Sequence, residues 1–122
     1  MITGAHLLLH SSNAEADRAF FRDVLQFKTV DAGHGWLIFG LPPAEAGIHP
    51  QENPAATPKD GSMAEATLYL MCDDLRATIK WLESKGCACA PVTDAGWGLT
   101  TNLRLPSGAN LGLYQPRHPT AI

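Results

Sequence analysis

Two stretches near the start of the chain carry histidines and a carboxylate at strand-like spacing. In "AHLLLH", His6 and His10 would lie on one face of a strand, because successive strand side chains point to opposite sides. In "EAGIHP", Glu45 and His49 would likewise share a face. If both faces point inward, His6, His49 and Glu45 form a set of the two-histidine, one-carboxylate kind that holds iron(II). The alternative is that these side chains hydrogen-bond a ligand or one another, since a histidine in a strand needs no metal.

Three cysteines, Cys72, Cys87 and Cys89, are the other soft metal ligands. In "CAC", Cys87 and Cys89 would share one face of a strand and could bind a metal together. The alternative is two small apolar residues of a strand, because a closed zinc site takes about four ligands and there is no second cysteine pair. An odd number of cysteines fits reduced thiols, so we expect a cytoplasmic protein without a disulfide framework.

The composition is typical of one soluble globular domain. The chain has 122 residues, of which 45% are hydrophobic and 17% charged. A net charge of -3 argues against a nucleic-acid or anionic-membrane partner. No hydrophobic run approaches the roughly 18 residues of a membrane span. The start, "MITGAHLLLHSS", lacks a basic leader and a cleavage site, so we expect no signal peptide.

Hydrophobic periodicity and turn residues predict the same order of elements twice. In the first half, a strand at 4–12 and a helix at 13–27 precede three short strands, at 27–32, 35–40 and 44–50. In the second half, a strand at 66–72 and a helix at 73–86 precede three strands, at 87–92, 99–105 and 109–116. The expected helix N-caps are Asn13 and either Asp73 or Asp74.

These elements divide the chain into module one (1–50), a linker (51–63), module two (64–118) and a tail (119–122). The linker is rich in proline, alanine and polar residues, which is typical of a connection between modules. Each half is too small to bury its own core well. We therefore expect the two modules to pack into a single domain.

This pattern resembles the vicinal oxygen chelate superfamily, which includes glyoxalase I, bleomycin-resistance proteins, extradiol dioxygenases and fosfomycin-resistance enzymes. Two stretches carry the resemblance: "AHLLLHSSNAEADRAFFRDVLQFKTV" and "LPSGANLGLYQP". The resemblance implies an α+β fold of two tandem βαβββ modules. They would form a curved mixed sheet with the helices outside and a concave ligand pocket inside. It also implies a homodimer.

The resemblance places a divalent metal, such as Fe, Ni, Zn or Mn, on four strand positions. Carried over residue by residue, these positions fall on His6, Gly47, Thr67 and Gly112. Only His6 is a ligand, because glycine has no donor side chain and a neutral threonine hydroxyl binds transition metals poorly. A catalytic metal takes about three protein ligands, so the site would have to be rebuilt around His6, His49 and Glu45.

The two glycines also allow another interpretation. A glycine removes side-chain volume from the cavity floor, so a flat or bulky ligand could approach the backbone closely. Taken singly, each aromatic residue fits core packing equally well; as a group, they favour an aromatic-lined pocket. The candidate pocket residues are His6, His10, Trp36, His49, Thr67, Tyr69, Trp97 and Tyr114.

Three functions follow. We favour a metal-independent protein that binds or sequesters a small aromatic or amphipathic molecule. The second is a metal-dependent lyase or extradiol-dioxygenase-like enzyme, in which the metal would act as a Lewis acid. The third is a non-catalytic interaction domain. Strand parity leaves it open whether Arg104 faces a ligand carboxylate or solvent.

Overall fold

The computed structural model describes residues 1, 4, 6–48, 50, 59–60 and 66–122. The chain divides into two compact units, which are described separately below. The first unit comprises Met1–Leu41 and Arg104–Asn110, and the second comprises Pro42–Leu103 and Leu111–Ile122. Across the described residues, no helix is long and apolar enough to cross a membrane.

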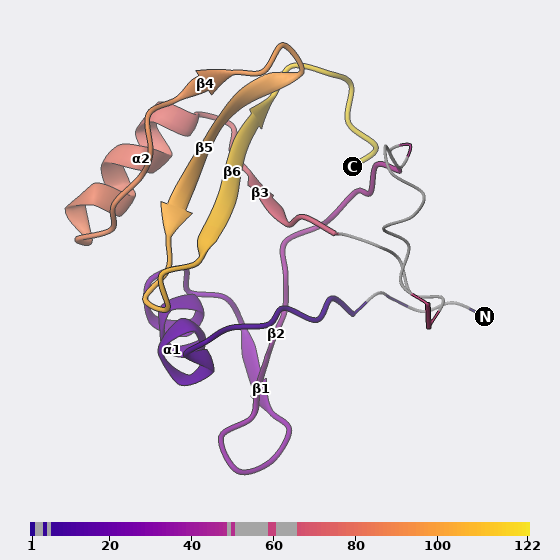
Figure 1. The fold of residues 1–122 in the computed structure, drawn as a ribbon, viewed down its shortest axis with the longest axis vertical. Coiled ribbons are helices and arrows are strands. Elements are labelled where there is room, and N and C mark those ends of the chain that lie inside the picture. Colours follow the sequence, from indigo (N-terminus) through magenta and orange to yellow (C-terminus); the bar gives the residue numbers. More distant parts are fainter. Residues whose placement is uncertain (2–3, 5, 49, 51–58, 61–65) are drawn as a thin grey trace. The chain divides into compact units, whose positions relative to one another are not determined.

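The first unit contains helix α1 (Ala14–Asp23) and a two-stranded antiparallel sheet of β1 (Thr29–Asp31) and β2 (Leu37–Phe39) (Figure 1). Asn13 caps the helix, because its side chain accepts a hydrogen bond from the Ala16 N–H at 3.2 Å. Phe21 of α1 makes edge-to-face contacts with Phe27 and Phe39, with ring centroids 5.7 and 5.4 Å apart. These rings form the small core that joins α1 to its sheet.

A buried carboxylate organises the polar side of α1. Asp17 is only 9% exposed. It accepts hydrogen bonds from Ser11 Oγ at 2.7 Å, from Ser107 Oγ at 2.7 Å and from the Ser107 N–H at 3.0 Å. Three donors replace the water that this charge loses, which makes its burial tolerable. The turn that contains Ser107 is thereby held to α1 within the first unit.

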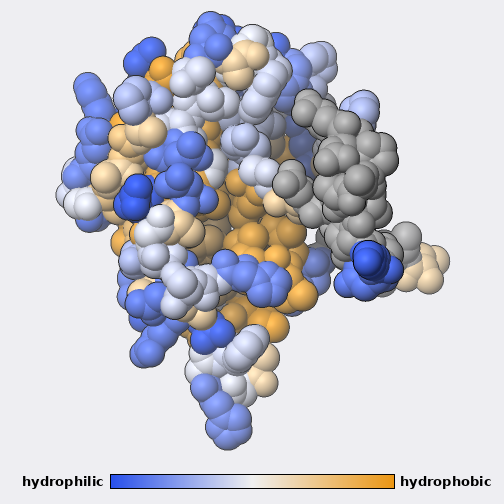
Figure 2. Space-filling view, in the orientation of Figure 1, coloured by the Kyte–Doolittle hydropathy of each residue, from blue (hydrophilic) through white to orange (hydrophobic). Residues whose placement is uncertain are grey.

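The segment before α1 differs from expectation. The structure assigns no strand to the described residues of the predicted strand 4–12, and the side chains of Leu7, Leu8 and Leu9 are 41%, 72% and 53% exposed. A run of leucines becomes a buried strand only if another strand pairs with its backbone. The described part of this unit supplies no such strand. Figure 2 likewise shows hydrophobic residues reaching the surface.

The second unit contains a four-stranded sheet and helix α2 (Leu75–Ser84). Its strands, in the order β3-β6-β5-β4, are β3 (Tyr69–Met71), β6 (Asn110–Pro116), β5 (Gly98–Arg104) and β4 (Thr93–Asp94). β3 runs parallel to β6, and β4 runs antiparallel to β5. The predicted strand 87–92 is reduced to one bridge, between Cys89 and Leu103. The predicted strand 44–50 is not formed in its described residues, and the tandem arrangement of modules stays a prediction.

Helix α2 packs on one face of this sheet (Figure 1). Asp74 caps it by accepting from the Ala77 N–H at 3.0 Å, and the Gln115 side chain accepts from the Leu75 N–H at 3.0 Å. The core is made of leucines from helix and sheet that are at most 2% exposed: Leu75, Leu82, Leu103 and Leu113. Truncation of one such leucine to alanine typically costs about 2–5 kcal/mol, so these contacts dominate the stability of the unit.

Replacing Asp17 by alanine should destabilise the protein by about 1–3 kcal/mol, because Ser107 and Ser11 lose their shared acceptor. Urea unfolding followed by circular dichroism measures this change. Asp23→Ala is the matched control, because Asp23 lies in the same helix and is exposed. Among the described residues it pairs with Arg22, an exposed ion pair, so no measurable change is expected. Unfolding of Asp17→Ala at the same urea concentration as the parent would contradict the role given to this carboxylate.

Candidate functional site

The pairing of β3 with β6 sorts side chains onto two faces of the sheet in the second unit. Tyr69 lies opposite Gly112, and Met71 lies opposite Tyr114. Because side chains alternate along a strand, Tyr69, Gly112 and Tyr114 share the face opposite Leu113. The leucine face is covered by α2, so the tyrosine face is where this unit can present functional groups.

Three aromatic rings meet on that face. Their centroids are 5.8 Å apart for Tyr69 and Trp97, 5.6 Å for Tyr69 and Tyr114, and 5.3 Å for Trp97 and Tyr114. All three pairs are edge-to-face, the favourable arrangement for aromatic quadrupoles. Tyr114 is buried at 8% exposure, whereas Tyr69 and Trp97 are 39% and 44% exposed. Tyr114 thus forms the floor of the cluster, and the other two rings offer open surface to a ligand.

The glycines beneath the cluster make room for the protein's own rings. A Cβ added to Gly112 would lie 2.5 Å from Cδ1 and 2.8 Å from Cε1 of Tyr69. A Cβ added to Gly98 would lie 2.7 Å from the Gln115 carbonyl oxygen and 3.2 Å from Cδ2 of Tyr114. The interpretation of Gly112 as open floor beneath a ligand is therefore wrong, because the Tyr69 ring fills that space.

Glu45 and the segment Arg117–Ile122 border the floor of the cluster. The Glu45 carboxylate accepts a hydrogen bond from the Ala121 N–H at 2.6 Å. The His118 ring lies nearly parallel to the Tyr114 ring, at 20°, with centroids 6.2 Å apart. Burial, and then the negative charge and hydrogen bonding of Glu45, raise the pKa of the Tyr114 phenol. Tyr114 therefore stays protonated at neutral pH, and its hydroxyl can donate a hydrogen bond.

Arg117 fixes the start of that segment against the loop that carries Trp97. Its N–H donates to the Trp97 carbonyl at 2.9 Å, and its guanidinium donates to the Asp94 carboxylate at 2.7 Å. The Gly96 N–H, and then Arg117, lower the pKa of Asp94. Sequence reasoning missed Arg117, His118 and Ala121. The sequence signal for His118 was a planar ring four residues after Tyr114. Ala121 gave no signal, because it takes part through its main-chain N–H, which every residue other than proline has.

The other predicted site residues lie in the first unit, before β3 or outside the described residues. His6 and His10 belong to the first unit and are exposed. Trp36 belongs there too; it is 63% exposed, with the Arg18 guanidinium 4.5 Å from its ring centroid. Thr67 is exposed and precedes β3. His49 lies outside the described residues, so the set of His6, His49 and Glu45 stays a prediction.

The donor set does not fit the metal site that the resemblance implies. No group of three histidine, cysteine or acidic residues within the described ranges could hold a metal ion. A ligating side chain at position 112 would also have to displace the Tyr69 ring. At "CAC", burial raises the pKa of both Cys87 and Cys89, and Glu83 raises that of Cys89 further. These shifts favour the protonated thiols in the metal-free protein, whereas a bound metal would itself deprotonate a thiol ligand.

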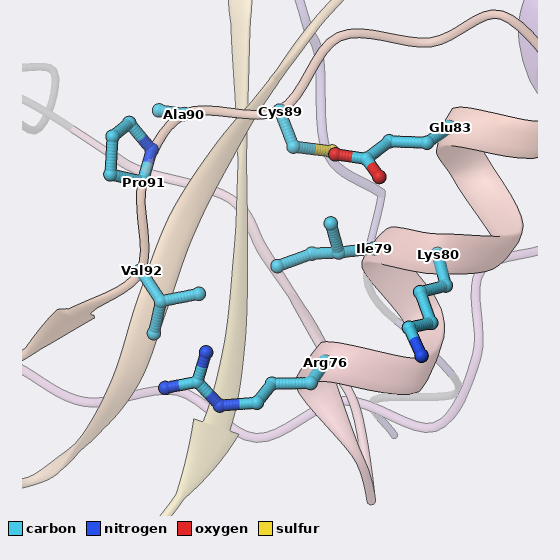
Figure 3. A pocket seen from close by; sticks show the side chains of 8 residues that line it. All are labelled: Arg76, Ile79, Lys80, Glu83, Cys89, Ala90, Pro91 and Val92. Atoms are coloured by element: carbon cyan, nitrogen blue, oxygen red, sulfur yellow. The ribbon is translucent and has the colours of Figure 1, made fainter.

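A surface hollow of about 450 Å³ lies elsewhere in the second unit, between α2 and the segment 89–92 (Figure 3). Ile79 and Val92 face one another across it (Figure 3). Its lining is aliphatic and charged, formed by Arg76, Ile79, Lys80, Glu83, Cys89, Ala90, Pro91 and Val92. None of these lining residues has an aromatic ring, so we place the candidate site at the aromatic cluster.

The Arg104 side chain, in the first unit, faces solvent and its own turn. Its side chain is exposed, and Nη1 donates to the Gly108 carbonyl at 3.4 Å. This contact spans the turn Leu105–Ala109, which the hydrogen bond from the Leu105 N–H to the Ala109 carbonyl closes at 2.8 Å. The local contact gives Arg104 a structural partner in its own turn.

Comparisons with known proteins agree with the fold. The family model described as Glyoxalase/Bleomycin resistance protein/Dioxygenase superfamily matches residues 4–111. The lactoylglutathione lyase of Agrobacterium tumefaciens superposes with a TM-score of 0.56 at 19% identity, over 88% of each chain. TnmS3, an antibiotic-binding protein from Streptomyces sp. CB03234, superposes with a TM-score of 0.54 at 20% identity, over 95% of this chain and 99% of that one.

An integron cassette protein from the mobile metagenome of V. cholerae superposes with a TM-score of 0.56 at 16% identity, over 94% of this chain and 98% of that one. At such identities the likeness shows the fold alone. No curated protein matches the sequence. The family match and these superpositions confirm the predicted family and the predicted α+β class.

Gly112→Ala should break the aromatic cluster, because the new methyl group needs the space of the Tyr69 ring. We expect loss of near-ultraviolet circular dichroism from the rings and a stability cost of about 1–3 kcal/mol. Gly40→Ala is the control: its Cβ would meet Lys28 at 3.7 Å, an ordinary contact. The double variant Gly112→Ala/Tyr69→Ala should recover part of the stability; no recovery would contradict the assigned clash.

Proposed function

Because the chain belongs to the Glyoxalase/Bleomycin resistance protein/Dioxygenase superfamily, we propose that it binds a small aromatic or amphipathic molecule on the exposed rings of Tyr69 and Trp97. The observation that carries this proposal is the 39% and 44% exposure of two rings whose positions are fixed by a third, buried one. Large rings held in place at the surface offer stacking area without the entropy cost of ordering them.

The polar groups beside the rings suit recognition rather than chemistry. The Glu45 carboxylate lies beside the phenol of Tyr114, the floor of the cluster. A few placed polar groups around an apolar surface are typical of small-molecule sites, where they set the orientation of the ligand. The antibiotic-binding protein that shares the fold supports the same kind of function.

Replacing Trp97 by alanine should weaken binding, because it removes one of the two exposed rings. A thermal-shift screen of planar aromatic compounds against the parent protein identifies binders, and calorimetry then compares the variants. We expect at least a tenfold loss for Trp97→Ala and for Tyr69→Ala, about the value of one lost stacking contact in a binding site.

Trp81→Ala is the matched control. This residue lies on α2, and its side chain is 41% exposed, close to the 44% of Trp97. Trp81 is not part of the ring cluster, so binding should stay at the parent level. Equal losses for Trp81→Ala and Trp97→Ala, or no binder in the screen, would count against the proposed function.

Removing metal should leave binding unchanged, because Gly112 offers no donor and its space is filled. The measurement is calorimetry with a screen-derived binder, before and after treatment with a chelator. Binding that disappears with chelator, returns with Fe, Ni, Zn or Mn, and is lost in His6→Ala would instead favour the metal-dependent alternative.

A further inference from the structure

The segment Arg117–Ile122 already makes ligand-like contacts at the aromatic cluster. A planar ring, that of His118, lies parallel to the floor ring Tyr114 at 20°. An N–H donor, that of Ala121, binds the Glu45 carboxylate at 2.6 Å. One short segment thus contacts both the aromatic ring of Tyr114 and the carboxylate of Glu45.

The contacts of His118 and Ala121 are separate from the two hydrogen bonds that anchor the start of the segment at Arg117. Arg117 is held by the Trp97 carbonyl and by Asp94, at 2.9 and 2.7 Å. Beyond it, His118 and Ala121 are exposed, and each makes a single contact with the cluster. Residues 118–122 can therefore leave the floor while Arg117 stays in place, because few contacts with the described residues resist their release.

From this arrangement we infer that residues 118–122 act as an internal competitor, and that the ligand which displaces them carries a flat ring and a cationic N–H donor. The ligand ring would replace the His118 ring on Tyr114, and its donor would replace the Ala121 N–H at Glu45. This inference rests on the proposed function, since it names the ligand class for the same cluster. A cation is favoured over a neutral donor because its hydrogen bond to a carboxylate is charge-assisted.

Two probes with the same ring and opposite charge test the ligand class: tryptamine, an ammonium, and indole-3-propionate, a carboxylate. Calorimetry on the full chain should show tryptamine binding about tenfold more tightly. Glu45→Gln keeps the shape and loses the charge, so it should remove this preference. Equal affinity of the two probes for the parent protein, or a preference unchanged in Glu45→Gln, would overturn the ligand class.

His118→Ala tests the competition. It removes the competing ring, so tryptamine should bind severalfold more tightly than to the parent. Thr120→Ala is the matched control within the same segment: its hydroxyl donates to the Ile122 carbonyl at 3.0 Å and does not contact the cluster. Weaker or unchanged binding of tryptamine to His118→Ala would contradict the competition.

Nuclear magnetic resonance follows the displacement directly. On addition of tryptamine, the Ala121 amide should lose its downfield shift and exchange faster with solvent. If tryptamine perturbs the Trp97 indole but leaves Ala121 unchanged, the internal competitor is ruled out and the proposed function stands. If tryptamine binds neither the parent nor His118→Ala, the ligand class is wrong. The proposed function is then tested separately, by the compound screen on the parent protein and the comparison of the parent with Trp97→Ala.

Discussion

The parallel pairing of β3 with β6 is the constraint on which the candidate site depends. Its register sets Tyr69 over Gly112 and aligns Met71 with Tyr114. A shift by one residue would turn Tyr69 toward α2 and bring a leucine to the opposite face. The leucine face against α2 resists that shift, because it would carry Leu70 of β3 away from Leu113, which it now pairs with on that face and which is 2% exposed. The core thus fixes the position of the aromatic rings.

Rigid rings and weakly held main chain lie next to each other in the second unit. Tyr69, Trp97 and Tyr114 support one another edge to face, whereas the segment after Arg117 makes few contacts with the described residues. This contrast suits the proposed function, because rings that are already in place need no ordering when a ligand arrives. Under that proposal, the charge of Glu45 would distinguish ligands that the rings alone would accept equally.

Much of the fold could be predicted from the sequence, because the signals were local. Asn13 and Asp74 cap helices as expected. Strands β1, β2, β3 and β6 lie inside predicted segments, and β5 begins one residue before its predicted segment 99–105. The failures concern long-range pairing. The run Leu7–Leu9 is apolar enough for a strand, but periodicity does not say which strand would pair with it. The segment 87–92 has a strand-like composition, yet it forms a single bridge.

For the site, residue types were easier to predict than their roles. Tyr69, Trp97 and Tyr114 were predicted as pocket residues and do meet in one cluster. Glu45 was predicted to take part in a metal set, whereas its described contacts are an amide and a phenol. Gly112 was interpreted as empty space. What fills a glycine's space is decided by a side chain 43 positions earlier in the chain, and no local pattern carries that information.

The close approach of Tyr69 to Gly112 also bears on how such a protein could change over generations. To gain a metal ligand at position 112, a lineage would first have to lose the tyrosine ring. A histidine or glutamate arriving first would clash with that ring. The effect of one change therefore depends on the other, and their order matters. Under the proposed function, ligand stacking on Tyr69 and a metal ligand at position 112 are mutually exclusive in this strand pair.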